Sequence, residues 1–127
     1  KEACDSLEEA AAVILGSPVY FGTVSAQLKA FWDKTRGIRS RKSLVGKPAA
    51  AVSVGAARFG GQETTIKALH DMLFIQGMTV VGEGLADADA GHQGVCAQKP
   101  AAEDSYALER ARILGKRLAR EVKKTAS

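Results

Sequence analysis

The chain has 127 residues, of which 46% are hydrophobic and 25% are charged, and its formal net charge is +4. These values are typical of a globular domain, so we predict a single domain over residues 1–127 with a substantial buried core. No apolar run approaches the roughly 20 residues needed to span a bilayer, so no membrane partner is expected. The sequence shows no signal-peptide pattern, and its two cysteines do not suggest a disulfide scaffold, so we expect a cytoplasmic protein.

Positive side chains concentrate in residues 36–47 and near the C-terminus. Such clusters can attract nucleic acid, phosphates or acidic partners. No aromatic residue interrupts the first cluster, so stacking on bases has no support and a nucleic-acid partner is not expected. A solvated helix face and a surface loop explain the two clusters more simply.

The first predicted strand is the continuous apolar run Ala12 to Leu15, which is typical of a parallel strand covered on both faces. It follows residues 7–11, which are either the tail of a short helix or a polar approach. A turn over residues 16–22 comes next. Apolar residues at helical intervals then predict a helix from Val24 to about Thr35, which Thr23 can cap and Gly37 can end.

Residues 38–47 are predicted to form a basic loop, followed by a second strand over residues 49–54. The glycine-containing turn 55–61 precedes a helix from Gln62 to about Gln76, and residues 78–81 form a third strand. Residues 82–102 carry no clear element, and a loop of this length is often functional or interfacial. A last helix runs from Glu103 to about Lys124, with Asp104 or Ser105 as its cap.

Strands and helices therefore alternate along the whole chain. This order predicts an α/β fold with a parallel sheet and right-handed crossovers. Ligands of such sheets bind at the carboxyl ends of the strands. The turns 16–22 and 55–61 follow two of these ends, so both are expected to open on one rim.

The residues of these two turns suit a flat heteroaromatic ligand. Tyr20 and Phe21 offer ring faces or edges, Arg58 offers charge for an anionic ring or a phosphate, and Phe59 can cover the far side. Glycines also allow a close backbone approach to a ring edge. We interpret the turns as a flavin site that needs no catalytic side chain, because the cofactor carries the redox step. The aromatic residues also suit ordinary packing, and the arginine an ordinary surface position.

Other catalytic sites find little support in the sequence. His70 lies in a predicted helix and is interpreted as a packing or surface residue, and no function is supported for His92. Neither cysteine belongs to a cluster with metal-ligand spacing, so no metal ligand is predicted. The sequence contains neither a GxSxG nor a GxGxxG motif, which disfavours a hydrolase and a dinucleotide-fold dehydrogenase.

Two motifs carry a family resemblance. The segment GSPVYFGTVSAQLKAFWDKT, followed by GGQETT and then QGM, resembles the flavodoxin-like NAD(P)H:quinone oxidoreductases of the WrbA group. It also resembles the wider set of NADPH-dependent FMN reductases and iron–sulfur flavoproteins. The similarity runs from about Leu7 to Val81 and returns weakly at residues 91–94 and in the last helix. An iron–sulfur form is not expected, because Cys4 has no neighbouring cysteine.

The resemblance implies a flavodoxin-like sheet in three α/β/α layers and an FMN site without a metal or a catalytic side chain. Departures from the family occur at Gln76, where a histidine is common, and at Gly37–Arg39, where a tryptophan is expected. The implied flavin contacts are Ser17, Pro18, Val19, Tyr20, Phe21 and Gly22 in the first loop, and Ser53, Val54, Gly55, Ala56, Ala57, Arg58, Phe59, Gly60 and Gly61 in the second.

Flavodoxin-like domains begin with a strand and a loop that grips the FMN phosphate, and no part of this sequence matches that loop. The chain resembles the C-terminal two-thirds of such a domain, which would truncate the strand order 2-1-3-4-5 to 3-4-5. A bare strand edge would result, which a longer chain or another copy would cover. We therefore expect weak FMN binding by these residues alone.

The resemblance implies an FMN-dependent oxidoreductase that passes electrons from NAD(P)H to a quinone or similar acceptor, assembled as a homo-dimer or tetramer. One alternative is a flavodoxin-type electron carrier with a protein partner, although such carriers are usually acidic. Another is a non-catalytic truncated flavodoxin-fold module.

Overall fold

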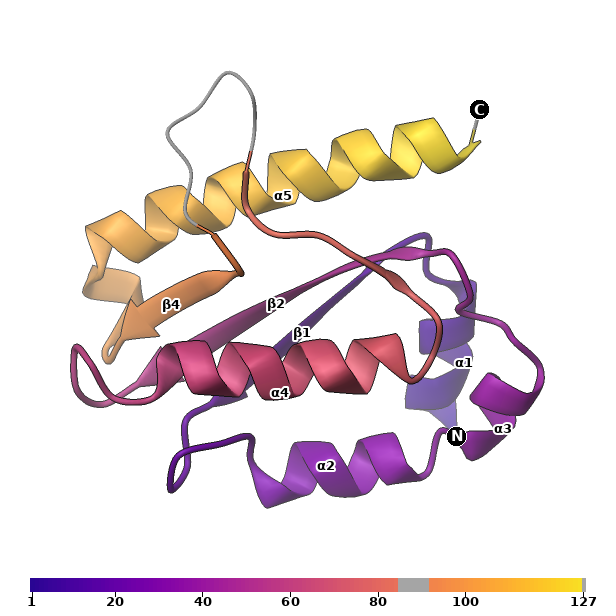
Figure 1. Ribbon diagram of the computed structural model, residues 1–127, viewed down its shortest axis with the longest axis horizontal. Coiled ribbons are helices and arrows are strands. Elements are labelled where there is room, and N and C mark those ends of the chain that lie inside the picture. The colour runs from indigo at the N-terminus through magenta and orange to yellow at the C-terminus, as the bar shows by residue number, and fades with distance from the viewer. Residues whose placement is uncertain (85–91, 127) are drawn as a thin grey trace.

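A computed structural model describes residues 1–84 and 92–126, which form a three-layer α/β/α structure (Figure 1). Its strands are all parallel. The strands are β1 (Val13–Pro18), β2 (Pro48–Gly55), β3 (Thr79–Val80) and β4 (Val95–Gln98). The helices are α1 (Glu2–Glu9), α2 (Ala26–Asp33), α3 (Arg36–Ser40), α4 (Gln62–Phe74), the short 3-10 helix η1 (Ala101–Glu103) and α5 (Ser105–Ala126).

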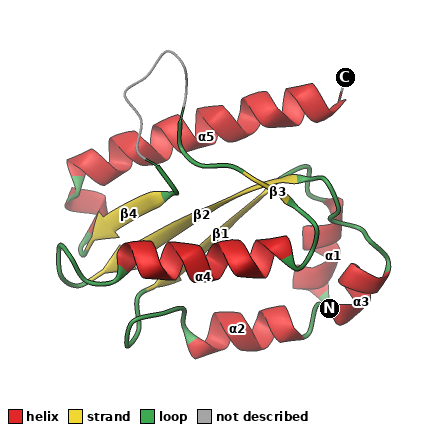
Figure 2. Cartoon of the chain, viewed as in Figure 1, coloured by secondary structure: helices red, strands yellow, loops and turns green. Residues whose placement is uncertain are grey.

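Strand β2 lies at the centre of the sheet (Figure 2). It pairs with β1 in a register that runs from Val13 opposite Ala49 to Pro18 opposite Val54. Its other edge pairs first with β3, which lies within the third predicted strand, and then with β4, which is not predicted. The other edge of β1 has no partner strand among the described residues, and Ile14 is half exposed there.

Helices cover both faces of the sheet, which explains why β2 is apolar along most of its length (Figure 1). Ala49 and Ala51 face the layer of α2 and α4, whereas Ala50 faces α5. These small side chains let the helices pack closely onto the strand. Large residues fill the space around them, and each fully buried one contributes roughly 1.5–3 kcal/mol. On one face they include Leu15, Trp32, Ile66, Leu69 and Leu73, and on the other Val95, Leu114 and Leu118.

A buried polar network joins the ends of α2 and α4. The Trp32 indole donates to the Met72 carbonyl at 2.7 Å, and the Thr35 hydroxyl donates to the Trp32 carbonyl at 2.6 Å. Gln76 donates through Nε2 to the Thr35 hydroxyl at 2.8 Å. Gln76 is one of the positions at which the sequence departs from the WrbA group. Its side chain therefore helps to hold the ends of α2 and α4 together.

The predicted start and end of the first long helix are wrong. Helix α2 begins at Ala26, because the Ser25 hydroxyl caps it by accepting from the Leu28 amide at 3.2 Å. Thr23 instead pairs with Tyr20 in a tight turn. Gly37 lies inside α3, which occupies the start of the stretch predicted as a basic loop.

The sheet also extends beyond the prediction. β1 continues through Ser17 and Pro18, because its pairing with β2 continues to Val54. β4 and η1 lie in the stretch for which no element is predicted. Only one residue of β4, Val95, is β-branched, so pairing with β2 decides this strand rather than local propensity. The other part of that stretch, residues 85–91, lies outside the described residues.

The predicted Asp104 cap of α5 is confirmed, since its carboxylate accepts from the Ala107 amide at 3.0 Å. α5 has 22 residues, and Ala107, Ile113, Leu114 and Leu118 are its buried residues. Within residues 1–84 and 92–126, no helix combines the length and apolar character required to cross a membrane.

A polar cluster around Glu8 fastens α1 to the segment before β2. The Glu8 carboxylate accepts from the Arg41 guanidinium at 2.7 Å and from the Ser43 hydroxyl, and Lys47 donates to the Glu8 carbonyl at 2.7 Å. The hydrogen bond from Arg41, followed by that from Ser43, lowers the pKa of Glu8 from 4.5 to about 2. The ionised form of Glu8 therefore favours the folded state.

We expect Glu8→Gln to lower the free energy of unfolding near neutral pH and to match the wild type in strong acid. The wild type loses this stabilisation as the pH falls from about 4.5 towards about 2, because folded Glu8 is protonated only there. Urea denaturation across this range measures the difference. Glu9→Gln, at an exposed neighbouring position, should keep the wild-type pH dependence. A Glu8→Gln deficit that is equal at every pH would contradict the assignment.

Candidate functional site

The carboxyl ends of β1, β2 and β4 meet at one rim, because the strands are parallel and in register. The first loop (residues 19–25), the second loop (56–61) and the third loop (99–104) leave the sheet there. The Val19 amide donates to the Val54 carbonyl at 2.9 Å, and the Lys99 amide donates to the Gly55 carbonyl at 2.8 Å. A Cβ at Gly61 would lie 3.2 Å from the Val19 side chain, so the first two loops are in contact.

The tip of the first loop is a strained turn. Tyr20 and Thr23 exchange backbone hydrogen bonds of 2.9 and 3.2 Å, while Phe21 and Gly22 have φ angles of 47° and 88°. Two positive φ angles are characteristic of a type I′ turn, whose first central position is usually asparagine, aspartate or glycine. The left-handed conformation costs a residue such as Phe21 about 1–2 kcal/mol. No burial of the Phe21 side chain offsets this cost, because that side chain is fully exposed. Tyr20 is 57% exposed.

Two predicted site residues lie beneath the rim. The buried Ser17 hydroxyl donates to the Pro18 carbonyl at 2.8 Å and accepts from the Ser25 amide at 2.9 Å. The buried Ser53 hydroxyl donates to the Gln62 carbonyl at 2.9 Å. These hydroxyls therefore fasten the strand ends to the starts of α2 and α4.

Gln62 organises the second loop, although it is not among the predicted site residues. Its buried side chain accepts from the Gly60 amide at 2.8 Å and donates to the carbonyls of Ala57 at 2.7 Å and Ala97 at 3.2 Å. A Cβ at Gly55 would lie 2.6 Å from Gln62 Nε2, so a larger residue there would displace the Gln62 amide. The signal available in the sequence was the polar residue directly after Gly60-Gly61, at the first position of the helix.

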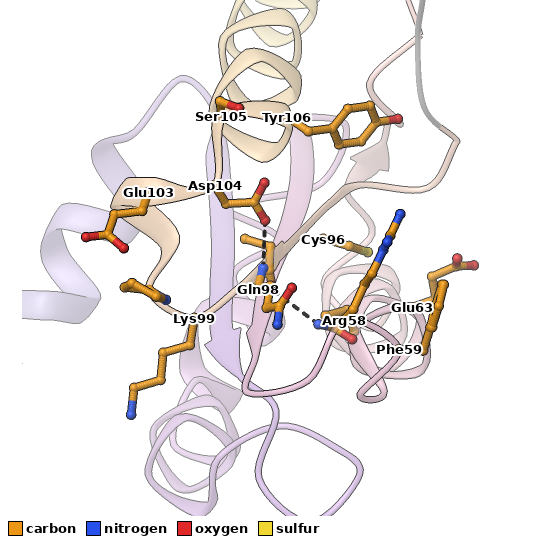
Figure 3. A pocket seen from close by; sticks show the side chains of 13 residues that line it. Arg58, Phe59, Glu63, Cys96, Gln98, Lys99, Glu103, Asp104, Ser105 and Tyr106 are labelled. Carbon is orange, nitrogen blue, oxygen red and sulfur yellow. Dashed lines mark hydrogen bonds between the residues drawn. The ribbon is translucent and has the colours of Figure 1, made fainter.

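The second loop presents Arg58 and Phe59 outward (Figure 3). Phe59 is 92% exposed, and the Arg58 guanidinium lies 5.5 Å from the centroid of its ring. This geometry is that of a cation–π contact. Tyr20, Phe21 and Phe59 thus place exposed aromatic rings on two adjoining loops, which is unusual for residues that serve only packing.

Arg58 and Phe59 also form one side of a cleft of about 810 Å³ (Figure 3). This volume is within the range of small-molecule sites. The opposite side comes from β4, the third loop and the start of α5, and none of these residues was predicted to belong to a binding site. Residues 17–22 do not line the cleft. The other lining residues are Gln62, Glu63, Cys96, Ala97, Gln98, Lys99, Pro100, Glu103, Asp104, Ser105 and Tyr106.

Asp104 holds the third loop together on this side of the cleft. Its carboxylate accepts from the Gln98 amide at 2.8 Å and from the Ala107 amide. These hydrogen bonds, with that from Gln98 the larger influence, lower the pKa of Asp104. The start of α5 thus carries a carboxylate that is fully ionised at neutral pH.

A smaller, partly open pocket of about 260 Å³, here called the inner cavity, adjoins the cleft and shares Glu63, Cys96 and Tyr106 with it. Burial raises the pKa of the Cys96 thiol, which disfavours the reactive thiolate. Burial also raises the pKa of Glu83, which lines the cavity.

Among the described residues, no group of three or more His, Cys, Asp and Glu side chains could hold a metal ion. His70 lies 6.4 Å from Phe74 between ring centroids, and burial lowers its pKa, which agrees with a packing role.

Comparisons with solved structures show the flavodoxin-like fold. A flavodoxin, WrbA-like protein from Agrobacterium tumefaciens has a TM-score of 0.81 at 23% identity, covering 98% of this chain and 73% of that one. A flavodoxin from the domain Archaea has a TM-score of 0.68 at 24% identity, with coverage of 94% and 71%.

Sequence comparisons identify more similar relatives. The chain is 47% identical over 123 residues to an iron–sulfur flavoprotein of Methanocaldococcus jannaschii, covering 96% of this chain and 64% of that protein. It is 42% identical over 76 residues to an NAD(P)H dehydrogenase (quinone) of Chromohalobacter salexigens, covering 60% of this chain and 38% of that protein. The chain thus spans less than two thirds of the length of these relatives.

A family match covers both glycine-containing turns. It extends over residues 1–93, from α1 past β3, and therefore includes the strained Phe21 turn and the loop held by Gln62. The family is one of oxidoreductases, and its description names FMN and NADPH, which agrees with the cofactors expected from the sequence. The chain therefore belongs to the NADPH-dependent FMN reductase family.

Proposed function

We propose that this chain supplies the ring-binding part of an FMN-dependent oxidoreductase that passes electrons from NAD(P)H to a quinone or similar acceptor. The observation that supports this most strongly is the first-loop turn, which holds Phe21 in a left-handed conformation with its ring fully exposed. Strain of this kind persists only where surrounding structure imposes it, and it concentrates at functional sites.

The residues on the rim fit a flavin ring. Tyr20 and Phe21 can stack on the ring or meet its edge, and Phe59 offers a further aromatic surface. Arg58 can place positive charge beside it. Ser17 and Ser53 would contribute through their backbone, because their hydroxyls are hydrogen-bonded internally. The remaining proposed contacts are the backbone groups of Pro18, Val19, Gly22, Val54, Gly55, Ala56, Ala57, Gly60 and Gly61.

Bound FMN would supply the two-electron redox chemistry. The chain's own residues would bind and orient the ring, exclude water with their aromatic side chains, and offset developing negative charge with Arg58. The cleft beside Arg58 and Phe59 has room for a nicotinamide or a quinone. Assembly into a dimer or tetramer is also part of this proposal, since it would cover the open edge of β1.

We expect the chain to bind lumiflavin, which lacks the ribityl phosphate, about as tightly as FMN, within roughly threefold. The assigned residues would contact mainly the ring, so the ribityl chain and its phosphate should add little affinity. Quenching of flavin fluorescence measures both Kd values, and oxidation of NADH or NADPH with a soluble quinone then tests turnover. The absence of binding by either flavin would contradict the proposal.

Phe21→Ala should weaken lumiflavin binding by about 2- to 10-fold, because an aromatic pair contributes roughly 0.5–1.5 kcal/mol. Phe74→Ala removes a half-exposed phenylalanine at the far end of α4 and should leave the affinity unchanged. Equal effects of the two substitutions would argue against a ring site in the first loop.

Phe21→Gly should raise the free energy of unfolding by roughly 1 kcal/mol, because glycine relieves the left-handed strain but loses more entropy on folding. Phe21→Ala keeps the strain and removes only exposed surface, so its stability should stay within about 0.5 kcal/mol of the wild type. Urea denaturation of the three proteins compares them. If Phe21→Gly and Phe21→Ala changed the free energy of unfolding equally, the turn would not be strained in solution.

Gln62→Met should lower the free energy of unfolding by about 2 kcal/mol and weaken lumiflavin binding, because it leaves the Gly60 amide and two carbonyls without their partner. Lys67→Met, at an exposed position of α4, is the matched control and should change both quantities little. Unchanged lumiflavin binding in a destabilised Gln62→Met protein would separate the second loop from the ring site.

A further inference from the structure

Glu83 is an unusual carboxyl because it is 3% exposed and its Oε2 atom has no hydrogen-bond partner among the described residues. A buried carboxylate without full pairing is costly, so such a group tends to bind a proton. Burial raises the pKa of Glu83, and the opposing influence of Arg110 and then of His92 is smaller.

The backbone holds Glu83 in this position from both sides. A Cβ at Gly82 would collide with the His92 carbonyl oxygen, so the packing of residues 82–84 against 92–94 requires glycine there. On the other side, Arg117 Nη1 donates to the Gly84 carbonyl at 2.7 Å, and its Nε pairs with Glu121 at 3.1 Å. The contacts of the neighbouring backbone therefore fix the buried position of Glu83.

Glu83 lines the inner cavity, which leads towards the cleft through their shared residues Glu63, Cys96 and Tyr106. The cavity volume of about 260 Å³ accommodates several water molecules, each of which occupies roughly 30 Å³ in the liquid. The titratable groups that line it are Glu63 from α4, Cys96 from β4, His92, and Tyr106 and Arg110 from α5.

We propose that Glu83 is a proton-transferring residue, which delivers protons through water in the inner cavity to an acceptor reduced in the cleft. This inference rests on the proposed function. Reduction of a quinone consumes one proton: NAD(P)H, a proton and the quinone yield NAD(P)⁺ and the hydroquinone. The O–H bond of Glu83 breaks, an O–H bond forms on a quinone oxygen, and the Glu83 carboxylate regains a proton from water.

The first test needs no cofactor. Carboxyl ¹³C resonances of the glutamate-labelled chain are followed by NMR as the pH is raised, and Glu83→Gln identifies the resonance of Glu83. We expect that resonance to titrate at a higher pH than the other glutamate resonances. A Glu83 carboxyl that ionises together with the exposed glutamates would overturn the proposal.

The second test follows quinone reduction with FMN added, as a function of pH. Wild-type turnover should fall as the pH rises through the pKa of Glu83, because only the protonated acid can donate. Glu83→Gln should lower kcat about 100-fold, leave the KM values for both substrates within about twofold, and remove this decline. Glu109→Gln, on the exposed surface of α5, is the matched control and should behave as the wild type.

The outcomes separate the two proposals. Failure of the wild type to reduce quinone would refute the proposed function, and with it the reaction that Glu83 would serve, whatever the NMR titration shows. Wild-type turnover together with an unchanged kcat and pH profile in Glu83→Gln would refute the role of Glu83 alone. A lowered kcat with an unchanged pH profile would also overturn it, because that result indicates a structural effect.

Discussion

The pairing of β2 with a parallel strand on each side is the constraint on which the rest of the structure depends. One edge of β2 pairs with β1 and the other with β3 and β4, so three strand ends reach one rim. Each face of β2 is covered by helices, which is why alanine fills so much of it. The loops at the rim therefore inherit their positions from the core, and an exposed tip such as Phe21 can remain strained.

Hydrogen bonds to buried side chains convert this rim into a defined surface. Ser17 fixes the start of α2, and Gln62 joins the second loop to β4. Neither group needs to touch a ligand in order to matter, because each holds backbone whose neighbours are exposed. At the second loop, Gln62 is buried and holds the backbone, whereas Phe59 is open to solvent.

The rim and the cleft differ chemically. Aromatic rings dominate the exposed surface of the first two loops, whereas charged and polar residues line much of the cleft and the inner cavity. Aromatic surfaces suit a flat ring, and buried carboxyl groups suit the movement of protons. Arg58 and Phe59 lie where the two regions meet.

The sequence by itself determined the parallel α/β order, the two glycine-containing turns and the family, because these depend on local apolar patterns and on contiguous motifs such as GGQETT. Only the tertiary structure decided the strand β4 and the burial of Ser17 and Ser53. Those features depend on partners distant in the sequence, which local propensity does not encode. The same reason explains why Glu83 gave no signal: its burial arises from packing against residues that follow it in the chain.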